Sequence, residues 1–370
     1  MYRLFSFSRV NKLSQSTELV RDAFLSGTTH RRALAARNYL DRNHLSPCIR
    51  PRVSSQPQQQ NIIAVVGPTA SGKSALGIAL ARELNGEIIN CDSVQVYQGI
   101  EIATAKVPVA ERRGVPHHLI DFVPPGVNYT AGEWARAAAQ TMDAIEARGR
   151  VPLLVGGTGF YLRALRRPFF PSPPTDPELR QRLNRIREQR GAEYLHRILK
   201  RLDHAAAAQL FPRDWPRVQR AIEVYMQTGR AISEQKDLRP EPPESARRLR
   251  ILALNPSRAE LYRRINERTD AHFGAGLVEE VRALLAQGVP PESNALGAHG
   301  YRRVVEYLQG YKDLPQAIAE TKLDVRHYAK RQLTWFRHEP NVEWIDGFGE
   351  EEEVQERVSR LVLGDQFETS

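Results

Sequence analysis

Short stretches rich in apolar residues recur along the chain, each bounded by turn-forming residues. They occupy residues 62–66, 87–91, 151–155 and 249–254. Apolar runs of this length are typical of strands that are buried on both faces of a parallel sheet. The segments between them carry apolar residues at the helical spacing of three to four positions. This alternation predicts an α/β fold built on a parallel sheet.

Further elements follow from shorter runs and from helix-start signals. Two strand-like runs, 116–122 and 341–346, extend the pattern. A Thr or Ser followed three residues later by Glu forms a capping box at residues 130–133 and again at 257–260, and each box predicts the start of a helix. The first of these helices is expected to run to about Arg148. Other helices are expected from residue 75, from 277 to 287, from 301, and from about 315 to 336.

A glycine-rich turn joins the first predicted strand to the first predicted helix. Its residues, Gly67-Pro68-Thr69-Ala70-Ser71-Gly72-Lys73-Ser74, match G-x-x-x-x-G-K-[ST] in full. In this motif, backbone N–H groups and the helix N-terminus point at one anion, and the lysine adds a positive charge. The Ser74 hydroxyl is the expected Mg²⁺ ligand. A turn that only starts a helix is the competing interpretation, but the strand and helix on either side favour a P-loop that binds a diphosphate or triphosphate.

Two other strands end in residues suited to chemistry. Asp92-Ser93 follows the strand at 87–91, and Gly156-Gly157-Thr158 follows the strand at 151–155. Ligands of open α/β sheets bind beyond the carboxyl ends of the strands, so both segments are expected beside the P-loop. The residues alone leave the role of Asp92 open: it is either a catalytic carboxylate, or a residue that caps a turn or ligates Mg²⁺ through water. The glycine pair permits close backbone approach to an anionic group.

The middle of the chain changes character between two proline-rich stretches. Residues 168–177 and 240–243 are dense in proline, and residues 178–235 between them show no strand pattern. This segment is helical in pattern and basic, which predicts an all-helical insertion in the α/β core. Its arginines form either a solvated surface or a surface that binds phosphate backbones.

The net charge of +10 is concentrated at the N-terminus. Residues 1–60 hold nine Arg and one Lys against three acidic residues, which leaves only +3 for the remaining 310 residues. The segment has no sustained apolar period and is predicted to be disordered. Three interpretations stay open: an organelle transit peptide, a basic arm that contacts RNA, or upstream sequence from a wrong start site. Global charge is therefore weak support for nucleic-acid binding.

Composition excludes two other classes of protein. No run approaches the ~18 uncharged apolar residues that a membrane helix needs. The two cysteines, Cys48 and Cys91, are too few for a disulfide framework or a zinc site. A protein of a reducing compartment, without a membrane span, is the expectation.

Taken together, the motifs resemble one family. The P-loop at 67–74 is followed in order by Asp92-Ser93 with Tyr97, Thr104-Ala105-Lys106, Gly156-Gly157-Thr158, Gly300-Tyr301-Arg302, and Lys330-Arg331-Gln332 through Arg337. This order and spacing resemble the bacterial type of tRNA dimethylallyltransferase (tRNA isopentenyltransferase) over residues 61–347. The combination is far more specific than any single motif.

The resemblance implies a reaction. A dimethylallyl group would pass from dimethylallyl diphosphate to N6 of the adenosine 3′-adjacent to the tRNA anticodon, giving N6-isopentenyladenosine and diphosphate. It further implies a P-loop NTPase-like core, Mg²⁺ as cofactor, the tRNA anticodon stem-loop as partner, and a cytoplasmic, monomeric enzyme. The target base would have to leave its stack to reach the protein.

The resemblance also assigns residues. It implies Asp92 as general base or hydrogen-bond partner at N6, with Thr158, Lys73 and Arg268 as the other catalytic residues and Arg264 as a second cation beside the diphosphate. The diphosphate site would be Gly67, Pro68, Thr69, Ala70, Ser71, Gly72, Lys73 and Ser74, and Ser74 would also hold the metal. The implied tRNA contacts are Asp92, Ser93, Val94, Gln95, Thr158, Arg180, Pro216, Arg217, Val218, Gln219, Arg220, Gly300, Tyr301, Arg302, Lys330, Arg331, Gln332 and Arg337.

The chain departs from the family pattern at several places. Gly297-Ala298-His299 precedes Gly300 where other residues are expected, and His272 stands where the family commonly has methionine. The zinc-finger extension of eukaryotic members is absent, which favours a bacterial protein. The expected organisation is a basic extension at 1–60, core at 61–174, tRNA-binding helical insertion at 175–238, core with C-terminal helices at 239–350, and an acidic tail at 351–370.

Three rivals remain on the residues alone. A P-loop small-molecule kinase using ATP would need lid arginines and an acceptor pocket, where this chain has a basic helical insertion. A non-catalytic, RNA-binding GTPase-like module lacks its base-specificity motif N-K-x-D here. An isopentenyltransferase acting on free adenine nucleotides would keep the chemistry, but would have no use for an insertion that grips tRNA.

Overall fold

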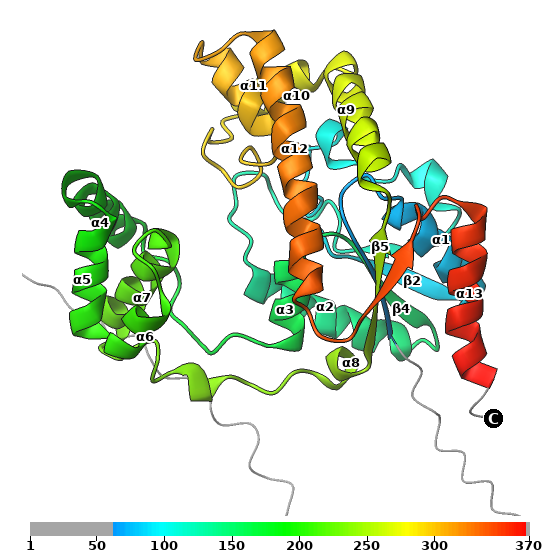
Figure 1. Cartoon of the computed structure of the whole chain (residues 1–370), viewed down its shortest axis with the longest axis horizontal. Coiled ribbons are helices and arrows are strands. Elements are labelled where there is room, and N and C mark those ends of the chain that lie inside the picture. Colours follow the sequence, from blue (N-terminus) through cyan, green and yellow to red (C-terminus); the bar gives the residue numbers. More distant parts are fainter. Residues whose placement is uncertain (1–61, 368–370) are drawn as a thin grey trace, which may run out of the picture. The chain divides into compact units, whose positions relative to one another are not determined.

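The sheet is fully parallel. The computed structural model describes residues 62–367 of the chain. Within that range six strands form one sheet in the order β3-β2-β4-β1-β5-β6, and every neighbouring pair is parallel (Figure 1), as the apolar runs predict. The strands are β1 Ile62–Val66, β2 Gly86–Asn90, β3 His117–His118, β4 Val151–Val155, β5 Leu249–Asn255 and β6 Val342–Asp346.

Helices cover both faces of this sheet. Two pack against one face, α1 Lys73–Glu83 and α13 Glu352–Phe367. The other face and the space beyond it hold α2 Ala131–Glu146, α3 Gly159–Arg166, α8 Glu244–Arg247, α10 Leu277–Ala286, α11 Tyr301–Leu308 and α12 Leu314–Arg337, with α9 Arg258–Gly274 packed on α12. Three short 3-10 turns are η1 Ile102–Thr104, η2 Val109–Arg112 and η3 Lys236–Leu238.

Alternation along β1 explains the two layers. Ile62 and Ala64 point into the cluster formed with α2 and α3, whereas Ile63 and Val65 point into the cluster formed with α1 and α13. Successive strand residues face opposite sides of a sheet, so a strand covered on both sides must be apolar throughout. All five residues of β1 are buried. The two layers hold the carboxyl ends of β1, β2 and β4 rigidly at one edge.

The segment between the proline-rich stretches is helical. It contains α4 Pro177–Arg190, α5 Ala192–Leu202, α6 His204–Gln209 and α7 Trp215–Thr228, and no strand lies in residues 177–238. Pro216 occupies the first turn of α7, where its missing N–H costs no hydrogen bond. Leu195, Leu199 and Val218 are buried in a hydrophobic cluster made of this segment's own residues. The domain boundaries themselves stay predictions.

The structure corrects three predicted elements. In the run 116–122 only His117–His118 is a strand, because Leu119 and Asp121 adopt left-handed φ angles of 56° and 54° that end the extended chain. Ser257 makes no side-chain cap, although the box at Thr130 is formed.

The third correction concerns the C-terminus. The predicted acidic tail is the helix α13, whose Val354, Val358 and Val362 are buried against the α1 layer. Its valines recur every four residues and so share one helix face. Residues 1–60, for which three interpretations were open, lie outside the described residues. None of the helices in residues 62–367 is long and apolar enough to cross a membrane.

Candidate active site

The predicted P-loop connects β1 to α1. Gly67 and Gly72 have positive φ angles of 144° and 80°, and α1 begins at Lys73. A Cβ at Gly67 would lie 3.1 Å from the backbone oxygen of Leu254 on β5, and one at Gly72 would overlap the Glu350 carboxylate. Both glycines are therefore required by backbone conformation and by close neighbours. The N-terminal N–H groups of α1 lack intrahelical partners and give the loop its affinity for anions.

Two cationic side chains lie beside the loop and have no carboxylate as a salt-bridge partner within the described residues. The Lys73 ammonium donates to the Pro68 carbonyl over 2.6 Å, and the Arg268 guanidinium of α9 donates to the Thr69 hydroxyl over 2.5 Å. Neither side chain forms a salt bridge with any of residues 62–367. Burial lowers the pKa of Lys73 to about 8, against the opposing charge of Asp92, and burial also lowers the pKa of Arg268. Half-buried cations that have no salt bridge are suited to an anionic ligand.

Asp92 lies beyond the end of β2 and faces the same space. One of its carboxylate oxygens accepts hydrogen bonds from the backbone N–H groups of Val94, at 2.8 Å, and Gln95, at 3.3 Å. The turn-capping role left open by the sequence is therefore real. The second oxygen accepts no hydrogen bond from the described residues. Capping holds the carboxylate still and leaves one oxygen free for a substrate.

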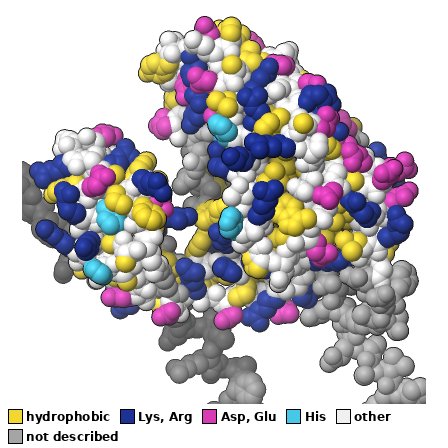
Figure 2. Space-filling view, viewed as in Figure 1, with side chains coloured by type: hydrophobic (Ala, Val, Ile, Leu, Met, Phe, Trp, Pro, Cys, Tyr) yellow, Lys and Arg dark blue, Asp and Glu magenta, His cyan; other side chains and the backbone are white. Residues whose placement is uncertain are grey.

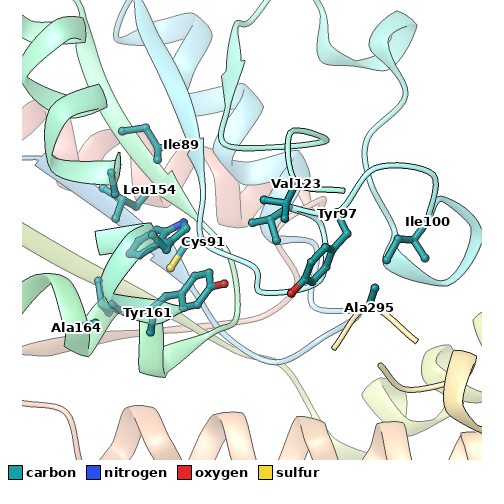
Figure 3. Close-up of a cluster of buried hydrophobic side chains, with 14 of the residues drawn as sticks. Ile89, Cys91, Tyr97, Ile100, Val123, Leu154, Tyr161, Ala164 and Ala295 are labelled. Atoms are coloured by element: carbon teal, nitrogen blue, oxygen red, sulfur yellow. The ribbon is translucent and has the colours of Figure 1, made fainter. Parts of the chain in front are cut away.

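A cavity of about 630 Å³ brings these groups together. Its wall includes Asp92, Thr69 and Arg268, with His272 and Phe273 further along α9. Beside it, Trp134 stacks on Tyr161 at 4.7 Å and donates to the Asn90 carbonyl, which supports the end of β2. Figure 3 shows the hydroxyl groups of Tyr97 and Tyr161 pointing toward one another next to Cys91. The cavity therefore has a cationic end at the P-loop and an aromatic wall beside Asp92.

Thr158 links the ends of β2 and β4. Its hydroxyl oxygen accepts a hydrogen bond from the Ser93 backbone N–H over 3.0 Å, and its hydroxyl lies 3.3 Å from the Ser93 hydroxyl oxygen. The glycine pair before it is needed for tight packing. A Cβ at Gly156 would lie 2.2 Å from the Cys91 carbonyl oxygen, and one at Gly157 would lie 2.1 Å from the Gln332 amide. The close approach predicted for these glycines is to protein groups.

Gln332 was predicted only as an RNA contact, and the structure corrects that role. The side chain is buried, with 5% of its surface exposed, so it presents nothing to a macromolecule. Its oxygen accepts from the Thr69 N–H at 2.8 Å, and its nitrogen donates to the Gly157 carbonyl at 2.9 Å. No sequence signal points to this bridge, because its partners lie 263 and 175 residues away.

Arg264, predicted as a second diphosphate cation, already pairs with two carboxylates in the structure. Its guanidinium pairs with Glu260, at 2.9 Å, and with Glu350, and it stacks on Phe348 at 3.6 Å. The Gly349 N–H in turn donates to the Ser71 carbonyl at 2.9 Å. The segment after β6 thus braces the P-loop from outside, a contact that the sequence reasoning missed.

The predicted RNA contacts on α12 lie beside a second groove. Lys330, Arg331 and Arg337 are exposed, and Figure 2 shows Lys, Arg and His side chains gathered over α12. The groove is about 600 Å³ in volume, and its lining residues are Arg163, His327, Lys330, Arg331, Thr334, Trp335 and His338. Arg302 is also exposed and pairs with Asp324 at 3.2 Å. This surface is positive and partly aromatic.

The predicted RNA contacts of the helical segment divide into two groups. Arg180 pairs through both its Nε and Nη2 with the buried Glu223, at 2.8 and 3.1 Å, and Arg220 reaches the same carboxylate at 3.4 Å. Pro216 and Arg217 are exposed. Side-chain contacts to RNA are ruled out for Val218, Gln219 and Tyr301, because all three side chains are buried.

A metal site made by protein side chains alone is not present in residues 62–367, where no three His, Cys, Asp or Glu side chains cluster. The P-loop fits a different arrangement. Ser74 is half-buried in the first turn of α1, and its hydroxyl makes no hydrogen bond within the described chain. Mg²⁺ is commonly held by few protein ligands together with substrate phosphates, so Ser74 fits that role.

The chain resembles known proteins over most of its length. A family model described as IPP transferase matches residues 95–339, and one described as isopentenyl transferase matches residues 60–120. A tRNA dimethylallyltransferase of Solibacter usitatus is 48% identical over 297 residues, covering 80% of this chain and 95% of the relative.

Solved structures agree with this assignment. The tRNA isopentenylpyrophosphate transferase of Bacillus halodurans is 35% identical with a TM-score of 0.60, covering 84% of this chain and all of that one. A eukaryotic dimethylallyltransferase, studied acting on tRNA, is 27% identical with a TM-score of 0.68, covering 84% of this chain and 80% of that one. The P-loop, the cavity beside it and these similarities lead to one conclusion: the chain belongs to the IPP transferase family, together with the tRNA dimethylallyltransferases.

Proposed function

We propose that this protein transfers a dimethylallyl group from dimethylallyl diphosphate to N6 of the adenosine 3′-adjacent to the tRNA anticodon. Its tRNA dimethylallyltransferase relatives support the reaction. One structural observation supports this reaction for the residues of this chain. Arg268 and Asp92, whose carboxylate has one free oxygen, line the cavity beside the P-loop, and Lys73 of the loop interacts electrostatically with both.

The P-loop end of the cavity is suited to the leaving group. Loop N–H groups, Lys73 and Arg268 offer positive charge to both phosphates of the donor, and that charge becomes more valuable as the carbon–oxygen bond breaks. Thr69 receives the Arg268 hydrogen bond and so fixes where the guanidinium points. The loop therefore holds a departing diphosphate, and no phosphoryl group is transferred.

Asp92 is suited to the acceptor. An exocyclic adenine amine is a weak nucleophile, and a carboxylate that accepts its N–H both aligns the nitrogen and takes the proton as the new bond forms. Val94 and Gln95 occupy one carboxylate oxygen, which leaves the other for N6. Thr158 holds the Ser93 backbone beside it and keeps this wall of the cavity in place.

Ser74 would hold a divalent cation, for which we propose Mg²⁺. When bound, the ion would neutralise charge on the diphosphate as it leaves. The chain's own contribution is the Ser74 hydroxyl at the start of α1, close to Lys73.

The anticodon stem-loop is proposed to bind across positive surfaces. On α12 these are Lys330, Arg331 and Arg337, and on the helical segment they include Arg217. Phosphate contacts of this kind give affinity that falls as salt rises. The predicted monomeric state and cytoplasmic location remain predictions.

A transferase assay tests the proposal. The protein is incubated with dimethylallyl diphosphate, Mg²⁺ and unmodified tRNA, and isopentenyl-adenosine is measured after nuclease digestion. Asp92→Asn keeps an acceptor for the Val94 and Gln95 N–H groups but cannot take a proton, so turnover should fall about 10²- to 10⁴-fold with tRNA affinity unchanged. Absence of product from the wild-type protein, with an active control enzyme, would contradict the proposed reaction.

The same assay separates the rivals. A kinase would consume ATP in the presence of an acceptor, and an enzyme for free nucleotides would alkylate AMP faster than the stem-loop. We expect neither, because the Lys330 and Arg331 surface and the helical segment offer extended positive surfaces that a small acceptor does not need.

A further inference from the structure

The proposed donor site and RNA surface leave one of the sequence motifs without a role, Thr104-Ala105-Lys106. This segment begins at the end of η1 and contacts the turn that carries Asp92. Lys106 is a buried cation, with 3% of its side-chain surface exposed. A buried ammonium group is costly unless it is paired and hydrogen-bonded, so the partners of Lys106 indicate what it does in the fold.

The motif segment holds the chain just after Asp92 at two points. The Lys106 ammonium donates to the Tyr97 carbonyl over 2.7 Å. In the opposite direction, the side-chain nitrogen of Gln95 donates to the Thr104 carbonyl over 2.9 Å. Gln95 is among the predicted RNA contacts, and its amide nitrogen has this partner inside the protein. The turn after Asp92 is therefore fastened to the motif segment at both Gln95 and Tyr97.

A third segment, the one that follows β3, closes this arrangement. Asp121 pairs with the Lys106 ammonium, and the Asp121 backbone N–H donates to the Gln95 carbonyl over 3.1 Å. Glu101 supplies a second carboxylate, which lies 3.1 Å from the same ammonium. The charge of Lys106 is thus balanced within the protein. Its ammonium group joins the segment after β2 to the segment after β3.

The turn that is held in this way sets the direction of the Asp92 carboxylate. One oxygen of the carboxylate accepts hydrogen bonds from the backbone N–H groups of Val94 and Gln95. The Tyr97 N–H donates to the Val94 carbonyl over 3.1 Å, so a displacement of Tyr97 is passed on to Val94. Because these bonds fix the first oxygen of Asp92, the position of its free oxygen follows the turn.

We propose that Lys106 is a positioning residue for the reaction: it holds the turn after β2 so that the free oxygen of Asp92 meets the N6 amine. This rests on the proposed function and deepens it. Lys106 acts through Asp92 and not on the substrate, because its buried ammonium group is occupied by three protein oxygens. The donor site depends on other contacts, since Lys73 and Arg268 bond to the P-loop itself.

Loss of the Lys106 ammonium should therefore slow the chemical step and spare binding. Lys106→Met keeps an unbranched side chain but cannot donate to the Tyr97 carbonyl. A misplacement of about 1 Å in an active site can cost about 100-fold in rate, and we expect the single-turnover rate constant to fall by about that factor. Donor affinity and tRNA affinity should stay unchanged. Gln95→Leu removes the second fastening point and should slow the same step.

Lys312 offers a matched control. Its side chain is also largely buried, with 12% of its surface exposed, and its ammonium also pairs with two carboxylates, Glu306 at 2.7 Å and Glu320 at 2.5 Å. These partners lie on α11 and α12, and not on the segments that hold Asp92. Lys312→Met and Lys106→Met should both lower the resistance to urea. Only Lys106→Met should lower the single-turnover rate constant.

A double-mutant cycle tests whether Lys106 acts through Asp92. The single-turnover rate constant is measured for the wild-type protein, Lys106→Met, Asp92→Asn and the double variant, with excess enzyme and saturating dimethylallyl diphosphate. Lys106→Met should slow the wild-type protein about 100-fold but have little effect beside Asp92→Asn, where the proton acceptor is already lost. A loss by the same factor in both backgrounds would show that Lys106 does not act through Asp92, which overturns the proposal.

The concentration of folded protein in each sample is taken from the calorimetric stoichiometry of donor binding, so a partly unfolded preparation does not imitate a slower reaction. An unchanged rate constant in Lys106→Met would overturn the proposal, and so would an equal loss in Lys312→Met. If Lys106→Met does not fold, Gln95→Leu takes its place in the same cycle with Asp92→Asn. Absence of product from the wild-type protein would instead contradict the proposed function itself.

Discussion

The side-chain oxygen of Gln332 accepts a hydrogen bond of 2.8 Å from the backbone N–H of Thr69, which ties the P-loop to α12. The same amide donates to the Gly157 carbonyl. One buried side chain thus joins the loop for the donor, the segment before Thr158, and the helix that carries Lys330 and Arg331. The proposed donor site and the proposed RNA surface are therefore joined by this side chain.

Gln332→Met should lower kcat/KM for the donor about 100-fold. The change leaves the buried Gly157 carbonyl unpaired, at a cost of about 1–3 kcal/mol, and removes the hydrogen bond that holds the partly buried Thr69 N–H of the P-loop. Donor KM and tRNA affinity are measured separately. Leu323→Ala, at an exposed position of the same helix, is the control. If Gln332→Met weakens tRNA binding while donor KM stays constant, the residue contacts RNA after all.

Donor affinity should fall as pH rises above about 8. Burial holds the pKa of Lys73 near 8 in the free protein, and the diphosphate binds the protonated amine. Below that pH the proton is already present. Above it, binding must take up a proton, so Kd rises up to about tenfold per pH unit until the pKa of the complex is reached. Calorimetric titration of donor measures Kd across this range.

Lys73→Arg is the control for that pH dependence. The guanidinium stays charged throughout, because its pKa lies above about 12. The Kd of this variant should therefore stay flat between about pH 7 and about pH 9.5, even where its absolute value is weaker. A wild-type Kd that is equally flat would show that Lys73 keeps its ordinary pKa.

Substitutions of Arg180 and Arg217 should affect different properties: the stability of the protein for Arg180, and the salt dependence of tRNA binding for Arg217. Glu223 is fully buried and is bonded twice by Arg180, and Arg220 reaches it only at 3.4 Å, so Arg180→Gln should lower the free energy of unfolding by about 2 kcal/mol. Arg217 has 71% of its side-chain surface exposed, so Arg217→Gln should spare stability and reduce the salt dependence of tRNA binding. Urea unfolding and binding at several salt concentrations separate the two effects. An unchanged salt slope for Arg217→Gln would mark it as solvated surface.

Val358→Ala on α13 should cost about 2 kcal/mol of stability, because a fully buried side chain leaves a cavity against the α1 layer. Glu356→Ala, on the exposed face of the same helix, should change stability by less than about 0.5 kcal/mol. Urea denaturation of both variants provides the comparison. Equal stability of the two would mean that α13 is not part of the cooperative core.

The sequence by itself determined the parallel sheet, the P-loop and the placement of Asp92 and Thr158 at strand ends. These depend on signals that are local in the chain: apolar runs, glycines at fixed offsets, and one short motif. The family resemblance added Arg268, and the structure indeed places that side chain on Thr69.

Only the tertiary structure decided which cations remain without a carboxylate partner. Arg264 and Arg268 lie one turn apart on α9, and nothing in the sequence distinguishes them. In the structure Arg264 pairs with Glu350, whereas Arg268 has no salt bridge with the described residues. Gln332 and Tyr301 are likewise predicted from the sequence as RNA contacts at the surface, but packing buries both side chains. Pairing and burial depend on partners far away in the chain, and no local pattern encodes the distance between them.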